Sequence, residues 1–98
     1  MPSPEKKTYL VAYDVVSDRR RNRLARRLAE VGVRVNYSVF EVVCNDGEFG
    51  VLTADLRRFV KASQDHVRIY PLCRRCLDGG QVIGTPHPER LDSGVEEV

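Results

Sequence analysis

A single acid, Asp14, closes an apolar run near the N-terminus, and a dense group of arginines follows it. Residues 19–27 hold six arginines, and no acid interrupts residues 19–29. Guanidinium groups in such numbers match phosphate oxygens, which they can hold with paired hydrogen bonds. A carboxylate is the kind of hard oxygen ligand that Mg²⁺ prefers, and a metal-bound water can attack a phosphodiester. The pattern therefore indicates a protein that binds nucleic acid, with metal-dependent cleavage as one hypothesis.

Both features also have an ordinary structural interpretation. An Asp at a strand end commonly starts a turn or caps the next helix. A run of charge is usually a solvated helix face, and Arg26 and Glu30 stand at the spacing of an i,i+4 ion pair. For Asp14 the sequence by itself favours the structural interpretation, and for the arginines it leaves the two about equal.

The length and the distribution of charge limit how many domains the chain can form. The sequence has 98 residues, with 42% hydrophobic and 31% charged content, which suits one compact domain. The net charge is only +2, but residues 88–98 hold one arginine and four acids, so residues 1–87 carry a net +5. We therefore expect a basic domain over residues 1–85 and a mobile acidic tail over residues 86–98.

The N-terminus carries no targeting signal that we can detect. The first eight residues, MPSPEKKT, are polar, and the apolar stretch from Tyr9 to Tyr13 is too short for a signal peptide or a membrane span. We expect a cytoplasmic protein with no membrane partner.

The elements that must position Asp14 and the arginines follow from periodicity and turn residues. The pattern predicts a strand, a helix that begins at Ser17 or Asp18 and stops at Gly32, a strand region split near residues 36–38, a second helix, a strand and a short last strand. The strands cover Thr8–Val15, Arg34–Cys44, His66–Leu72 and Gln81–Gly84, and the second helix runs from Glu48 to near Ser63. This order, β-α-β-β-α-β with a short extra C-terminal strand, predicts an α+β ferredoxin-like fold.

Such a fold leaves one sheet face without helices. In the first strand, Tyr9, Val11, Tyr13 and Val15 share one face, and Leu10, Ala12 and Asp14 share the other. Because both faces are largely apolar, the uncovered face needs a partner, and a second copy is the simplest one. Two Asp14 carboxylates could then approach each other across a two-fold axis and hold a divalent cation.

The helical wheel sorts the arginines. At about 100° per residue, Arg19, Arg23 and Arg26 fall on the outer side of the first helix. Arg20 and Arg27 flank its buried stripe. The outer three are the expected phosphate contacts.

Three cysteines, Cys44, Cys73 and Cys76, do not suggest a disulfide framework in a chain without a secretion signal. Cys73-Arg-Arg-Cys76 has the spacing of half a zinc knuckle or of a redox pair, but the chain has no second pair to complete a zinc site. We therefore expect structural thiols.

Several segments, in the right order over residues 9–85, resemble the CRISPR-associated Cas-two family, small adaptation proteins that accompany the Cas-one integrase. They are YLVAYDV, the DRRRNRL helix start, RVNYSVFEV and VRIYPLCRRC.

The resemblance implies a homodimer in which the last strand joins the partner's sheet, with a Mg²⁺ or Mn²⁺ site at the interface. It implies that Asp14 is the catalytic metal ligand. It also implies supporting or substrate-contacting roles for Tyr13, Arg21, Arg23 and Phe40, whereas Ser38 is a motif residue of unassigned role.

Two functions stay open at this point. In one, the dimer binds double-stranded DNA and bridges integrase units, for which it needs arginines but not Asp14. In the other, the protein is a metal-dependent endonuclease that cleaves RNA or double-stranded DNA, in its strictest form a toxin-like endoribonuclease. An RNA-recognition module of the same strand order is disfavoured, because its aromatic stacking motif is absent.

Overall fold

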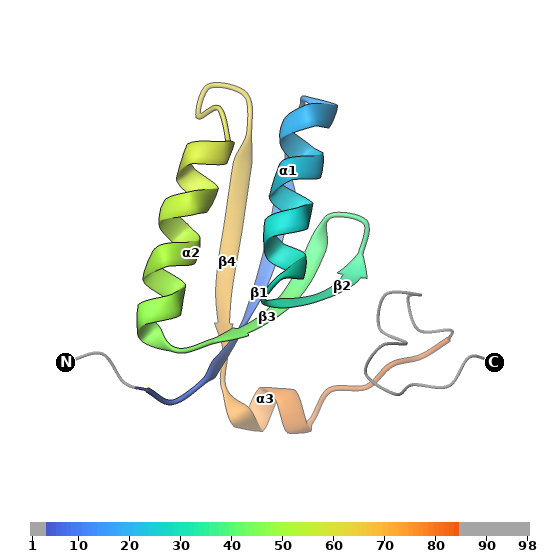
Figure 1. Ribbon diagram of the computed structural model, residues 1–98. Coiled ribbons are helices and arrows are strands. Elements are labelled where there is room, and N and C mark those ends of the chain that lie inside the picture. Colours follow the sequence, from blue (N-terminus) through green and yellow to red (C-terminus); the bar gives the residue numbers. More distant parts are fainter. Residues whose placement is uncertain (1–3, 85–98) are drawn as a thin grey trace.

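The computed structural model describes residues 4–84. As far as β4 its elements follow one another in the predicted order (Figure 1). They are β1 (Lys7–Asp14), α1 (Asp18–Ala29), β2 (Gly32–Asn36), β3 (Val39–Cys44), α2 (Asp46–Phe59), β4 (His66–Leu72) and α3 (Arg74–Asp78). The α+β, ferredoxin-like arrangement is confirmed. The acidic tail expected over residues 86–98 lies outside the described residues.

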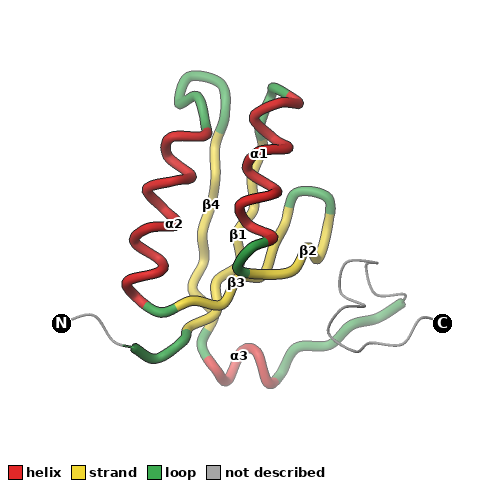
Figure 2. Tube along the Cα trace, viewed as in Figure 1, coloured by secondary structure: helices red, strands yellow, loops and turns green. Residues whose placement is uncertain are grey.

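The four strands form one antiparallel sheet in the order β2-β3-β1-β4. Strand β1 is central and pairs with β3 on one side and β4 on the other. Helices α1 and α2 lie side by side on one face of this sheet (Figure 2). We call the opposite face, which neither α1 nor α2 covers, the open face.

Local side-chain hydrogen bonds set where the helices begin. The Ser17 hydroxyl accepts a hydrogen bond from the Arg20 N–H, as expected of an N-cap. Asn45 and Glu48 form a capping box, in which each side chain accepts from the backbone N–H of the other. Helix α2 therefore starts at Asp46, two residues before the predicted Glu48.

The core lies between the helices and the sheet. Leu24 and Leu28 of α1 and Leu52 of α2 are fully buried against Val11 and Val42. The alternation predicted for the first strand is confirmed, since its helix-facing residues are buried and Asp14 at its end is exposed.

The open face carries apolar side chains with nothing on top of them in the single chain. Leu10 and Ala12 of β1 are half-buried, whereas Val43 of β3 and Tyr70 of β4 are 49% and 47% exposed. The register places Tyr70 opposite Leu10 and Val43 opposite Thr8, so these side chains share one surface. The face therefore has the character of an interface.

The C-terminal part differs from the prediction. Residues 74–78, expected to precede a simple turn, form the short helix α3, and residues 81–84 form no strand in the described chain. A strand of four residues needs a neighbouring strand to pair with, and residues 81–84 pair with no strand of the described chain. Within residues 4–84, every helix falls short of the length and apolar character needed to cross a membrane.

Candidate functional site

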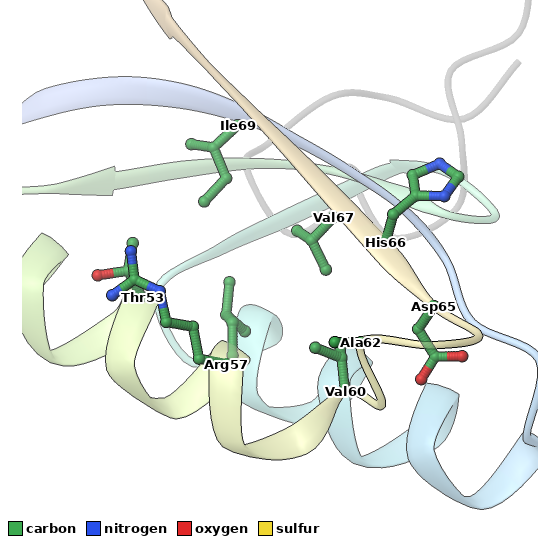
Figure 3. Close-up of a pocket in the computed structure, with 9 residues that line it drawn as sticks. Thr53, Arg57, Val60, Ala62, Asp65, His66, Val67 and Ile69 are labelled. Atoms are coloured by element: carbon green, nitrogen blue, oxygen red, sulfur yellow. The ribbon is translucent and has the colours of Figure 1, made fainter.

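Asp14 is the last residue of β1 and lies exposed at one end of the open face. The register puts it directly opposite His66, the first residue of β4. Figure 3 shows the His66 ring on the side of β4 away from Val67. Residues opposite each other in antiparallel strands have Cβ atoms about 4.5–5.5 Å apart. Asp14 and His66 therefore form a polar pair at one end of the open face, and Arg68 of β4, opposite Ala12, lies next to them on the same face.

The segment that follows Asp14 is held by a buried acid that the sequence did not single out. The side chain of Asp65, in the loop before β4, is fully buried. Its carboxylate accepts from the backbone N–H of Val16 at 3.0 Å and of Lys61 at 2.8 Å. It also accepts from Arg20 Nε at 2.8 Å and Nη2 at 3.1 Å. One side chain thus joins the chain just beyond Asp14 to α1 and to the loop after α2.

These hydrogen bonds determine the charge state of Asp65. The Arg20 guanidinium, helped by the two backbone N–H groups, holds the pKa of Asp65 well below its usual range, although burial opposes this. The carboxylate is therefore ionised at neutral pH and fixes the start of α1. An isolated acid in a polar loop, whose arginine partner lies 45 residues away, leaves no signal in the sequence.

Tyr13 of β1 and Phe40 of β3 face the helices, on the opposite side of the sheet from Asp14. Ser38 lies in the β2–β3 turn. Tyr13 is buried, its N–H donates to the Ser38 carbonyl at 3.0 Å, and its hydroxyl donates to the Tyr37 carbonyl at 3.3 Å. Its ring packs against Phe40 with centroids 6.3 Å apart. Through these contacts the three residues connect the end of β1 to the β2–β3 turn.

The six arginines of α1 divide into three groups. Arg20 and Arg27 face α2 and its following loop, where they pair with Asp65 and Asp55 at 2.8 Å. Arg21 binds the Val15 carbonyl at 2.8 Å and pairs with Asp18. The remaining three, on the outer side, are Arg19, Arg23 and Arg26.

Two of the outer arginines carry free charge. Within residues 4–84, Arg19 and Arg26 are exposed and form no ion pair or hydrogen bond through their side chains. The predicted pairing of Arg26 with Glu30 is wrong, because Arg27 reaches Glu30 instead, at 3.2 Å. The free guanidinium groups remain available for phosphate oxygens.

Arg23 has a contact that the helical wheel did not predict. Its guanidinium lies 4.3 Å from the centre of the Phe59 ring, and that of Arg58 lies 5.5 Å from the same ring. The stack keeps both cations while fixing their positions. The basic surface therefore continues from α1 to the last turn of α2 and the loop after it, where Arg57 and Lys61 are also exposed.

Arg34 of β2 is a further residue that the sequence analysis did not single out. Its guanidinium lies 5.2 Å from the centre of the Phe40 ring, beside the support formed by Tyr13 and Phe40. A β-branched and aromatic strand pattern gave no reason to select it.

A groove of about 380 Å³ lies between the C-terminal half of α2 and β4 (Figure 3). Its walls include Leu56 and Val60 of the α2 side and Val67 and Ile69 of β4, with Arg57 at its rim. Asp14 does not line it. Asp65 and His66 do line it, so the groove lies next to the end of the open face that Asp14 and His66 form.

Comparison with known proteins decides among the folds that share this strand order. Residues 7–79 match the family described as CRISPR associated protein Cas2. The chain belongs to the Cas2 family.

Two curated relatives are each 38% identical to it. One, from Synechocystis sp., covers 80% of this chain and 85% of its own, and the other, from Archaeoglobus fulgidus, covers 92% and 98%. Both are named CRISPR-associated endoribonuclease Cas2.

Solved Cas2 structures have the same fold. Streptococcus pyogenes Cas2 superposes with a TM-score of 0.71 at 27% identity, covering 79% of this chain and 99% of that one. A Cas2-like chain in a structure described as a partial Cas6-RT-Cas1–Cas2 complex gives a TM-score of 0.68 at 31% identity, over 79% and 90% of the two chains. The family resemblance read from the motifs is therefore confirmed.

Proposed function

We propose that this Cas2 protein acts in CRISPR adaptation, as a homodimer that binds DNA on its basic helices and bridges units of the Cas1 integrase. The observation that carries the proposal is the pair of free guanidinium groups, Arg19 and Arg26, on the outer side of α1. The comparison with a Cas2 chain in a complex that also contains Cas1 supports the choice of partner.

The arginine surface suits duplex DNA of any sequence. Arg19, Arg23 and Arg26 project from one side of a helix, and Arg58 extends the charge onto α2 through the shared Phe59 ring. Guanidinium groups bind phosphate oxygens without reading bases, and each contact releases counterions from the DNA. A bridging protein must hold fragments of unrelated sequence, so this type of contact fits the role.

A second copy is the proposed cover of the open face. The exposed Val43 and Tyr70 would be buried there, and the two Asp14 side chains would lie at the same interface. Residues 81–84 would pair there with a strand edge of the partner, since within residues 4–84 they pair with no strand of their own chain.

A divalent metal fits Asp14 in such a dimer. Within residues 4–84 no three potential ligands come together, but Mg²⁺ commonly binds through one or two carboxylates and keeps several waters. When bound, Mg²⁺ or Mn²⁺ supplies a water of lowered pKa that can attack a phosphodiester. The chain's own part is to hold the carboxylate in place, through the buried Asp65 that anchors the residues after it.

Metal-dependent cleavage of RNA or double-stranded DNA is the second candidate function. The exposed carboxylate of Asp14 favours it, since no ion pair or hydrogen bond within the described residues occupies that side chain. The relatives from Synechocystis and Archaeoglobus, which are both named as endoribonucleases, support it as well. The cleavage hypothesis needs Asp14, whereas the bridging hypothesis needs the arginines.

A reconstituted spacer-integration assay with the Cas1 partner separates the two. We expect the variant Arg19→Glu/Arg26→Glu to bind duplex DNA weakly and to fail in integration, whereas Asp14→Asn supports integration normally. The variant Arg19→Lys/Arg26→Lys, which keeps both charges, is the control for folding and should retain binding.

The salt dependence of binding gives a second readout. Each lost phosphate contact should reduce the slope of log K against log salt by about 0.9. Loss of integration in Asp14→Asn, with the Cas1 complex intact and the Glu variant active, would reject the bridge and leave an obligatory nuclease.

A further inference from the structure

Cys73 and Cys76 are two thiols that the candidate site does not use, and they lie together on the surface. Their Sγ atoms are 3.3 Å apart, and both residues are exposed. Cys44, by contrast, is buried in the core of the fold. Packing as a small apolar side chain, which the sequence analysis expected of all three, therefore describes Cys44 but not the other two.

The backbone holds the two thiols at a spacing that a disulfide can close. Cys73 is the N-cap of α3, and its Sγ accepts from the N–H of Cys76 at 3.4 Å. Side chains three positions apart in a helical turn are neighbours. A disulfide needs an S–S distance of about 2.05 Å and Cα atoms about 4.4–6.8 Å apart. From their contact at 3.3 Å, the two sulfurs must approach by only a little more than about 1 Å to reach that S–S length.

We propose that Cys73 and Cys76 form a reversible dithiol–disulfide pair that exchanges with small-molecule disulfides of the glutathione class. The Cys73 thiolate attacks one sulfur of the small disulfide, which forms a mixed disulfide and expels one thiolate. The Cys76 sulfur, after losing its proton to water, attacks Cys73 Sγ and expels the second thiolate. Two protein thiols are oxidised, one small disulfide is reduced to two thiols, and excess small thiol reverses both steps.

The two sulfurs have different roles in this exchange. The backbone N–H of Cys76 donates to Cys73 Sγ at 3.4 Å, and this hydrogen bond, together with the contact to the Cys76 sulfur, lowers the pKa of Cys73. The same thiol contact, together with the charge on Cys73, raises the pKa of Cys76. The thiolate is the reactive form, so Cys73 is the attacking thiol and Cys76 is the resolving thiol.

Cys73 and Cys76 lie just after the last residue of β4, where the chain leaves the sheet. Strand β4 ends at Leu72, next to Cys73, and Leu77 of α3 lines a groove together with Leu72 and Glu41 of the open face. A disulfide would fix the first turn of α3. It would thereby fix the direction in which α3 and residues 79–84 continue from the end of β4. The oxidised and reduced proteins should therefore differ in the mobility of this segment.

The test uses the full-length protein in buffers that contain glutathione at graded ratios of oxidised to reduced form. After rapid alkylation of free thiols, mass spectrometry locates disulfides and bound glutathione. We expect the wild type to lose the Cys73 and Cys76 thiols together, with no glutathione retained, and to recover both in excess reduced glutathione. Cys44 should stay reduced throughout and serve as the internal control.

Single variants identify the order of attack. Cys76→Ser should trap one glutathione on Cys73, because the resolving thiol is gone, whereas Cys73→Ser should react more slowly at Cys76. In the oxidised wild type, amide hydrogen exchange at Cys76 and Leu77 should slow relative to the reduced protein and to the double variant Cys73→Ser/Cys76→Ser.

Three results would overturn the proposal. One is that both thiols remain free in fully oxidised glutathione, and another is that each retains its own glutathione without an internal disulfide. The third is stoichiometric zinc in the purified protein that protects both thiols from oxidation and is lost in the double variant, because the pair would then be a metal ligand.

Discussion

The guanidinium of Arg20 holds the buried carboxylate of Asp65 at both oxygens, with Nε 2.8 Å from Oδ2 and Nη2 3.1 Å from Oδ1. The same carboxylate accepts the N–H of Val16, two residues beyond Asp14. The ion pair therefore connects the acid proposed to bind metal with the helix proposed to bind phosphate.

Replacing Asp65 by Asn should destabilise the protein markedly at neutral pH, because Arg20 then loses a buried ionic partner. The folded state lowers the pKa of Asp65, so its contribution is complete above the unfolded-state pKa of about 3.9 and is lost as the pH falls toward the folded-state value. Urea unfolding at pH 7 and pH 3 should show the gap between wild type and Asp65→Asn narrowing in acid.

A less buried acid provides the comparison for this prediction. Asp55 also pairs with arginine and has a lowered pKa, but its side chain is 22% exposed. Asp55→Asn should therefore cost less stability than Asp65→Asn at pH 7. Equal losses in the two variants would contradict a special role for the buried carboxylate.

Any nuclease activity should require Mg²⁺ or Mn²⁺ and should disappear in Asp14→Asn. The fold should persist because Asp14 is exposed in the single chain, and the dimer should persist because its proposed interface rests on apolar side chains such as Val43 and Tyr70. Asp18→Asn is the matched control, because Asp18 is another exposed acid and lies on α1. Cleavage of labelled RNA and duplex DNA, with and without EDTA, makes the measurement. Full activity in excess EDTA would eliminate the metal hypothesis.

Gly32→Ala should lower stability by about 1–3 kcal/mol, because a Cβ at this position would meet the backbone of Glu41 and Val42 on the neighbouring strand. Gly50→Ala provides the opposite case. It lies within α2 with open space around it, so alanine should stabilise the helix by about 0.5–1 kcal/mol. Chemical denaturation of both variants tests the pair. A Gly32→Ala protein as stable as the wild type would refute the close approach of β2 to β3.

Truncation after Gly80 should yield monomer or aggregate, whereas truncation after Pro88 should leave a dimer. Residues 81–84 form no strand within the described chain, and the proposed dimer gives them a partner strand edge. Light scattering of the two proteins makes the comparison. A soluble, stable dimer that ends at Gly80 would show that these residues do not hold the dimer together.

The regular elements were predictable because their signals are local. The alternation of Tyr9, Val11 and Tyr13 is visible in consecutive residues, and β4 matches its predicted range, His66–Leu72. Helix α3 was missed because five residues are too few to show a helical period.

Only those site residues were predictable that stand out from their immediate neighbours along the chain. Asp14 stands out as an acid at the end of an apolar run, and its exposure is confirmed. The arginine partner of Asp65 lies 45 residues away along the chain, and the Phe59 ring lies 36 residues from Arg23, so only the packing of α1 against α2 reveals these contacts. The helical wheel placed Arg23 on a free surface because it could not include the Phe59 ring.

The central position of β1 determines when the fold can be completed during synthesis. Strand β1 is made first, but its two neighbours are β3 and β4, and the pairing of Asp14 with His66 closes a loop of about fifty residues. Only the β2–β3 hairpin can form from a short stretch of nascent chain, and distant pairings make folding slower. A ribosome-bound chain that ends before residue 66 therefore exposes one edge of β1. The open face gains its Asp14–His66 end only when the last strand of the sheet leaves the exit tunnel.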